Sequence, residues 1–308
     1  MKLIRKIDEL TAARGSLKNS AVSIGNFDGV HHGHQKLISR LTALATKHGG
    51  PSVVFTFDPH PVRLLRPEKA PPPLTWTKRK AALLSALGVD FMVAYPTDHD
   101  LLQLTPDEFF QQIVLEKLGT AALVEGPNFY FGKNRAGDVN ALQALCDANK
   151  VTLEVVQPTE DDGELISSSR VRAAIAAGDI DGARRMLTSP YRVRGMVTHG
   201  AARGSKIGFP TANLSAIDTL VPGHGVYAGI AHVSGESFQA AINIGTNPTF
   251  GEDECKVEAH LLDFDRNIYG QAVEVDFLTR LRDIQPFPNV EALTTQLRHD
   301  IESTRSAN

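Results

Sequence analysis

Strand-length apolar runs alternate with amphipathic helical stretches over the first half of this chain, and this alternation limits the possible folds more than any other feature. The strand-like runs are residues 21–24, 52–57, 90–95 and 121–125, and the helical stretches are residues 77–87, 106–118 and 138–149. Continuous apolar runs of this length are typical of buried parallel strands. We therefore predict an α/β domain with a doubly wound parallel sheet, a fold that binds ligands at the carboxyl ends of its strands.

The pattern changes after Pro190. Short strand-like segments then follow one another without intervening helices, at residues 191–197, 225–233, 238–244, 256–264 and 272–278. Such spacing, with glycine-bearing turns, predicts a small antiparallel β-barrel, and an amphipathic helix at 290–303 closes it. The 308 residues are enough for two cores, and we predict domains of residues 1–186 and 187–308.

Composition excludes several classes of protein. Apolar residues make up 42% of the chain and charged residues 22%, the balance of a globular protein. The net charge of −3 gives no reason to expect a nucleic-acid or membrane partner, and nothing indicates the oligomeric state. Cys146 and Cys255 are far apart, which argues against a disulfide framework. The N-terminus lacks the apolar core of a signal peptide, so we expect a cytoplasmic protein.

The turn after the first predicted strand has the features of a phosphate site. Residues 25–34 lead from strand to helix, and the N–H groups and dipole at a helix start attract anions. His31 and His34 stand three residues apart, and Gly33 between them lets a phosphate approach the backbone. The histidine pair could instead bind a metal, but no carboxylate or cysteine stands at matching spacing.

Three further segments follow predicted strands and are expected at the same edge of the sheet. His60 lies in the proline-stiffened segment 58–61, and Asn128 and Phe129 lie in a loop that mixes aromatic and cationic residues. Aromatic rings can hold a flat ligand while cations hold phosphate. Residues 167–172 combine three serines, which can cap a helix, with Arg172, although such serines are often plain caps.

Two features of the second half also suggest ligand contacts. Gly204, Lys206 and Gly208 lie in a loop that could wrap phosphates, although its spacing is not that of a P-loop. Glu258 alternates with Val257 and Ala259, and this pattern alone indicates a solvated strand residue.

These residues together carry a resemblance to a known family. The chain resembles the prokaryotic bifunctional riboflavin kinases/FAD synthetases along nearly its whole length. Residues 31–34, His-His-Gly-His, resemble the H-x-G-H signature of nucleotidyltransferases, and residues 167–172 are similar to their S-S-T-x-x-R signature, with Ser169 where threonine is usual. Residues 210–213, Pro-Thr-Ala-Asn, resemble the P-T-A-N signature of riboflavin kinases.

The resemblance implies two ATP-dependent reactions: riboflavin to FMN in the barrel, and FMN to FAD in the first domain. For the kinase it implies Glu258 as catalytic base, Thr211 and Asn213 as Mg²⁺ ligands, and phosphate contacts from Gly204, Lys206 and Gly208. For adenylyl transfer it implies catalytic roles for His31, His34 and Arg172, phosphate contacts from Gly25, Asn26, Phe27, Asp28, Gly33, Ser168 and Ser169, and flavin contacts from His60, Asn128 and Phe129.

Some positions depart from the family pattern. Ser205 and Asn247 stand where arginine is expected, and Ile284 and Pro286 stand where glutamate and lysine are expected. These departures leave the fine shape of the flavin pocket open. Three alternatives also remain: a kinase whose first domain has lost adenylyl transfer, a non-catalytic flavin-binding regulator, and a nucleotidyltransferase for another substrate, which would leave the barrel unexplained.

Overall fold

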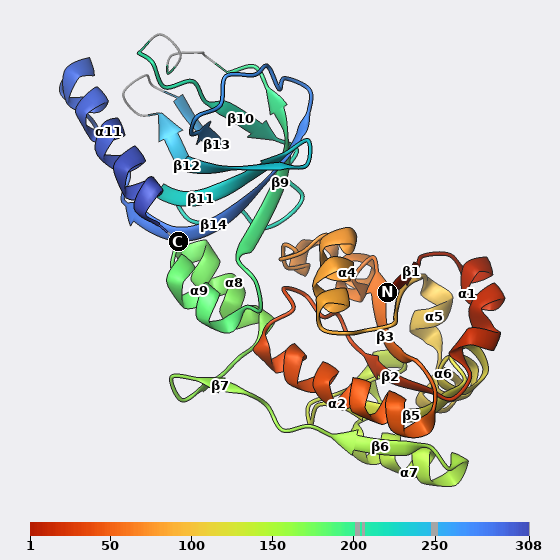
Figure 1. Ribbon diagram of the computed structural model, residues 1–308. Coiled ribbons are helices and arrows are strands. Elements are labelled where there is room, and N and C mark those ends of the chain that lie inside the picture. Colours follow the sequence, from red (N-terminus) through yellow and green to blue (C-terminus); the bar gives the residue numbers. More distant parts are fainter. Residues whose placement is uncertain (201–203, 205–206, 248–251, 308) are drawn as a thin grey trace. The chain divides into compact units, whose positions relative to one another are not determined.

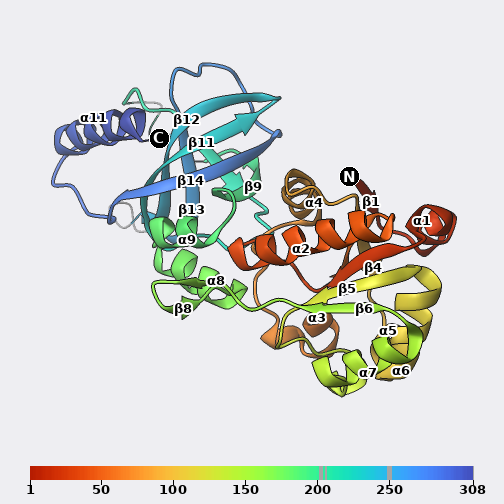
Figure 2. The same cartoon turned by 60° about the horizontal axis from the view of Figure 1, so that its bottom comes forward.

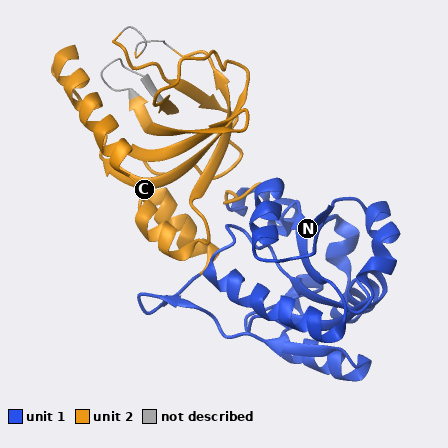
Figure 3. Cartoon of the chain, viewed as in Figure 1, with its two compact units in different colours: residues 1–71, 77–166 blue, residues 72–76, 167–308 orange. Residues whose placement is uncertain are grey.

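A computed structural model of the chain describes residues 1–200, 204, 207–247 and 252–307. These residues form two compact units, Met1–Pro71 with Thr77–Ile166 and Pro72–Trp76 with Ser167–Asn308 (Figure 3). The short segment Pro72–Trp76 joins the second unit through bonds such as that from the Leu220 N–H to the Pro73 carbonyl, 2.9 Å. The predicted domain boundary at residues 186 and 187 stays a prediction.

The first unit contains a six-stranded sheet in which every pairing is parallel. Its strands are β1 (Lys2–Ile4), β2 (Ser20–Ile24), β3 (Ser52–Asp58), β4 (Phe91–Pro96), β5 (Thr120–Glu125) and β6 (Thr152–Val155), in the order β1-β4-β3-β2-β5-β6. The four strands expected from the apolar runs are present. The two edge strands, β1 and β6, are additions, since neither has a continuous apolar run.

Helices cover both faces of this sheet, so successive strand residues enter different cores. Val53 and Phe55 pack with α1 (Ile7–Ala13), α6 (Pro106–Phe109), the π-helix η3 (Phe110–Lys117) and α7 (Val139–Asn149). Val54 packs on the other side with α2 (His32–His48) and α4 (Thr77–Ala86). Figure 2 shows α2 on one side of the sheet and α6 and α7 on the other. This double covering confirms the doubly wound fold.

Short elements complete the first unit. They are η1 (Arg14–Leu17), α3 (Pro61–Leu65), η2 (Pro67–Lys69), α5 (His99–Gln103), η4 (Lys133–Arg135), β7 (Glu160–Asp161) and β8 (Glu164–Leu165). The predicted helix at 106–118 is present, but after one α-helical turn it continues as the π-helix η3.

The second unit is built on a closed antiparallel barrel (Figure 1). Its strands are β9 (Tyr191–Thr198), β10 (Ala212–Ser215), β11 (Gly225–Val233), β12 (Glu236–Asn247), β13 (Glu252–Leu261) and β14 (Ala272–Arg282), in the order β10-β13-β12-β11-β14-β9. The unit also contains α8 (Ser168–Ala177), α9 (Ile180–Met186) and α11 (Val290–Ser306). The predicted barrel and closing helix are confirmed, and β10 is an additional strand.

Alternate barrel residues form the core, including the fully buried Val275, Ile242 and Ala259. The closing helix α11 is attached by a charged pair: the Arg282 guanidinium donates two hydrogen bonds to the buried Asp300 carboxylate, at 2.9 and 2.7 Å. Within the described part of the chain, no helix is long and apolar enough to cross a membrane.

Candidate active sites

The turn between β2 and α2 is strained and tightly packed. Phe27 and Val30 both adopt left-handed backbone conformations, with φ of 46° each, on either side of Gly29 at 85°. Left-handed conformations are costly for residues with bulky side chains. The side chains of Phe27 and Val30 are 3% and 0% exposed, so burial in the core holds them in place. The turn therefore fixes the position at which α2 begins relative to the end of β2.

His31 and His34 cap the start of α2 reciprocally. The His34 N–H donates to His31 Nδ1 and the His31 N–H donates to His34 Nδ1, each at 3.3 Å. The two rings stack with centroids 3.6 Å apart. Because each Nδ1 accepts a hydrogen bond, the proton of each neutral ring lies on Nε2. The cap thus sets two Nε2–H donors at a helix N-terminus.

Gly33 and the burial of His34 support this arrangement. A Cβ added at Gly33 would lie 3.1 Å from two atoms of the His31 ring, so a side chain there would disturb the stack. Burial, followed by the neighbouring His31 and Lys80, holds the pKa of His34 well below its usual range. His34 is therefore a neutral hydrogen-bond donor at physiological pH.

Lys80 of α4 contacts the same turn and was not predicted. Its Nζ donates to the Asn26 carbonyl at 2.5 Å, and Thr56 Oγ1 donates to that oxygen at 3.2 Å. One signal was present in the sequence. Lys78, Arg79 and Lys80 lie in the first turn of a helix, where the dipole disfavours cations.

The candidate flavin residues lie in two loops of the first unit. His60 caps α3, because its Nδ1 accepts the Val62 N–H at 3.1 Å. Asn128 is exposed, and the half-buried Phe129 stacks on Phe131 with centroids 5.6 Å apart. The flavin contacts of these residues stay predictions.

Glu125 joins the end of β5 to the end of β2. It is 3% exposed, and its Oε1 accepts the Ile24 N–H at 2.7 Å. Burial raises the pKa of this carboxyl well above its usual range. Glu125 thus supports the backbone immediately before the β2–α2 turn.

The predicted second anion site is a capped helix start. Ser167 caps α8 by accepting the Arg170 N–H at 3.2 Å, and Ser168 and Ser169 begin the helix. Arg172 donates from Nε to the Pro72 carbonyl at 2.9 Å. These residues belong to the second unit, whereas His31 and His34 belong to the first. Their convergence on one ligand stays a prediction.

In the barrel, Glu258 lies between two asparagines. It is directly opposite Asn213 of β10 on one side and Asn243 of β12 on the other. Directly opposed residues share a face of the sheet. All three are half-buried, on the face opposite the core residues Val257 and Ala259. The strand β10, which carries Asn213, thus places that amide beside the predicted base.

The neighbouring loop is partly described. The Gly204 carbonyl accepts the Ile207 and Phe209 N–H groups at 3.1 and 2.8 Å, and Gly208 has a φ of 87°. Ser205 and Lys206 lie outside the described residues, as does the side chain of Asn247. Of the other departures, Ile284 lies over Gly245, where an added Cβ would be 3.1 Å from its Cγ1. Nothing in the structure explains Pro286.

The donor chemistry beside Glu258 suits a hard cation. Thr211 and Asn213 offer oxygen atoms, which Mg²⁺ prefers, with phosphate and water as its remaining ligands. Among the described residues, no group of three or more histidines, cysteines or carboxylates could hold a metal alone. These residues thus fit a Mg²⁺ that arrives with ATP phosphates.

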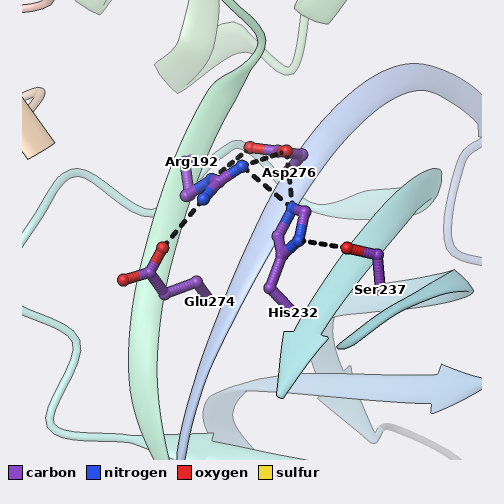
Figure 4. Close-up of polar contacts among 5 residues, drawn as sticks. All are labelled: Arg192, His232, Ser237, Glu274 and Asp276. Carbon is purple, nitrogen blue, oxygen red and sulfur yellow. Dashed lines mark hydrogen bonds and ion pairs between the residues drawn. The ribbon is translucent and has the colours of Figure 1, made fainter. Parts of the chain in front are cut away.

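A further polar network fastens the outer face of the barrel (Figure 4). Arg192 donates to both oxygens of the buried Asp276, at 2.5 and 2.6 Å, and to Glu274 at 2.9 Å. His232 lies between Asp276 and Ser237, 2.8 Å from each. The bidentate arginine already neutralises the carboxylate, so this network is a structural fastening of four strands rather than a nucleophilic triad.

Comparisons with known proteins match the two parts of the chain to two family models. The family model for FAD synthetase matches residues 13–170, and the model for riboflavin kinase matches residues 187–308. The bifunctional riboflavin kinase/FMN adenylyltransferase of Pseudomonas fluorescens is 38% identical over 307 residues, which cover 99% of this chain and 97% of that protein. The bifunctional riboflavin kinase/FMN adenylyltransferase of Bacillus subtilis (strain 168) is 35% identical over 286 residues, which cover 91% of this chain and 90% of that protein.

A solved structure is similar over its whole length. It is described as a macrolide-efflux protein from Streptococcus pneumoniae, and it matches this chain with a TM-score of 0.87 and 31% identity, covering 100% of both chains. The likeness therefore extends to both units.

Proposed function

The chain belongs to the family of bifunctional riboflavin kinases/FMN adenylyltransferases, and from that premise we propose which residues carry each reaction. The protein phosphorylates riboflavin to FMN and transfers an adenylyl group from ATP to FMN, which yields FAD and pyrophosphate. The observation that carries this conclusion is the pair of family matches, one to each predicted domain. The kinase-only, regulatory and other-substrate alternatives are not supported.

Glu258 is the proposed base of the kinase. Its carboxylate accepts the proton of the riboflavin 5′-hydroxyl while that oxygen attacks the γ-phosphorus of ATP and the bond to ADP breaks. The position of Glu258 directly opposite Asn213 supports this role, because it sets a carboxylate beside an amide of the P-T-A-N segment. Thr211 and Asn213 would hold Mg²⁺, which neutralises charge on the phosphates. Gly204, Lys206 and Gly208 are the proposed phosphate contacts.

Adenylyl transfer needs no general base, because the FMN phosphate is already an anion. Its oxygen attacks the α-phosphorus of ATP, and pyrophosphate leaves. Catalysis then rests on positioning and on donors aimed at the developing charge. The Nε2–H groups of His31 and His34, at the N-terminus of α2, are suited to this role.

Other residues complete the proposed adenylyl-transfer site. Gly25, Asn26, Phe27 and Asp28 lie in the β2–α2 turn, and Gly33 lies in the first turn of α2. Ser168 and Ser169 begin α8, and Arg172 follows in the same helix. His60, Asn128 and Phe129 are the proposed flavin contacts. The cytoplasm is the proposed compartment, which is consistent with Cys146 and Cys255 being free thiols. The domain division at residues 186 and 187 is likewise proposed.

One assay tests both activities. Purified protein incubated with riboflavin, ATP and Mg²⁺ should form FMN first and FAD afterwards, as followed by chromatography. Omission of Mg²⁺ should stop FMN formation. Accumulation of FMN without any FAD would contradict the assignment of the first domain.

A further inference from the structure

Lys80 occupies a position where the helix dipole and partial burial both disfavour a positive charge. It lies in the first turn of α4, where the helix dipole opposes a cation. Its side chain is half-buried, and burial of an ammonium is costly without compensating partners. Its Nζ donates to the Asn26 carbonyl at 2.5 Å and lies 3.5 Å from Thr56 Oγ1. The Lys80 side chain thus reaches from α4 to the backbone just after the carboxyl end of β2.

The contact falls on the backbone that precedes the strained turn. Asn26 is followed by Phe27, whose φ is 46°, and the turn ends at the capping residue His31. Two donors, Lys80 and Thr56, hold the one Asn26 carbonyl. Among the residues that the structure describes, Asn26 Oδ1 is buried and has no hydrogen-bond partner, which is rare in folded proteins.

Charges on three elements meet around this turn. Burial lowers the pKa of Lys80, while the carboxylates of Asp28 and Asp58, from the turn and from the end of β3, oppose that shift. His31 and the Lys80 ammonium both add to the burial that lowers the pKa of His34. Removing the ammonium therefore makes His34 easier to protonate.

We propose that Lys80 is a positioning residue for FMN adenylylation: it fixes the Asn26 carbonyl, and with it the turn that sets the His31 and His34 donors. The proposal rests on the adenylyl-transfer function and adds a residue to its machinery. Lys80 acts through the turn and through His34 rather than by contact with the reacting atoms.

Substitution of Lys80 tests this role, with a neighbouring lysine as the matched control. Lys80→Met should lower kcat for FAD formation from FMN about 100-fold with little change in KM for ATP, because the donors lose their alignment. Lys80→Arg should recover part of that loss. Lys78→Met, at an exposed position two residues earlier, should leave the rate unchanged. Thr56→Val, which removes the second donor to the Asn26 carbonyl, should lower kcat in the same direction by less.

A pH profile separates this role from plain structural support. In Lys80→Met the pKa of His34 rises. A proton on His34 Nδ1 removes the acceptor of the His31 N–H and with it the cap that aligns the two rings, so the acid limb of FAD formation should move to higher pH, whereas Lys80→Arg should keep the wild-type limb. Thermal unfolding of the same samples reports whether the first unit, which carries Lys80, has folded.

The proposal is overturned if Lys80→Met keeps the wild-type kcat, if only KM rises, or if the acid limb stays in place. Wild-type protein that forms no FAD would instead overturn the proposed function, so the two failures are distinguishable.

Discussion

The imidazole rings of His31 and His34 stack at 3.6 Å, and each Nδ1 accepts a hydrogen bond from the other residue's backbone N–H. One pair of side chains therefore both caps the helix and presents donors. Capping uses Nδ1, whereas the proposed phosphate contacts use Nε2. The two roles can be separated by substitution.

His31→Asn separates capping from catalysis. Asparagine is among the best capping residues, so it replaces Nδ1 as the acceptor but supplies no imidazole donor. We expect FAD formation to fall about 10²–10³-fold while thermal stability stays close to that of the wild type. His31→Ala, which also removes the cap, should cost a further ~1 kcal/mol of stability. Wild-type FAD formation by His31→Asn would contradict the donor role.

Glu125→Gln should make stability less dependent on pH. Burial raises the folded-state pKa of Glu125, so the folded protein binds the proton more tightly than the unfolded chain does. Stability is therefore greatest below the unfolded pKa of about 4.3 and falls as pH rises towards the folded pKa. Glutamine stays neutral and keeps an oxygen for the Ile24 N–H. The adenylyl-transfer activity that remains after heating should be measured from pH 5 to 8. It should fall less steeply with rising pH for Glu125→Gln than for the wild type, and parallel pH curves for the two proteins would refute this.

Asp276→Ala should destabilise the barrel selectively. It leaves the guanidinium of Arg192 without its bidentate partner, and removal of one member of a buried ion pair costs about 3–5 kcal/mol. Kinase activity should be lost at a lower temperature, with adenylyl transfer little affected. Asp218→Ala breaks the exposed pair with Arg194 and should cost only about 0–1 kcal/mol. Equal effects of the two substitutions would argue against the fastening role of the network.

The two thiols should differ in reactivity. Cys146 is buried, and burial raises its pKa to about 12, whereas Cys255 is exposed. Only the thiolate is nucleophilic. Alkylation of native protein at pH 8.5 followed by peptide mapping should therefore modify Cys255 alone, and denaturation should expose Cys146. Rapid modification of Cys146 in the native protein would show that its core opens.

The parts of the fold that could be predicted are those with a strong local signal. The run 52–57 indicates a strand because both faces of β3 are covered by helices. β6 carries the polar Thr152 and Glu154, so no apolar run marks it. β10 has only four residues after a proline and is a strand because β9 and β13, distant in sequence, pair with it.

In the candidate sites, too, features with a local sequence signal were predictable and contacts between distant residues were not. The helix start at His31 was predictable, because a strand, a glycine turn and a helix are adjacent in sequence; the anion site there stays a prediction. The cations in the first turn of α4 were a local signal that this segment is unusual. The contact of Lys80 with Asn26 joins residues 54 positions apart, so no local pattern identifies Asn26 as the partner. The alternation around Glu258 indicates a solvated residue, and only the family resemblance and its position opposite Asn213 indicate a base.

The most direct test of two separate active sites is the pair of rates for one substitution, Glu258→Gln, which keeps the shape of the side chain but cannot take a proton. FMN formation from riboflavin should be abolished, while FAD formation from supplied FMN should continue at the wild-type rate. Equal loss of both reactions, or kinase activity that survives the substitution, would contradict the account.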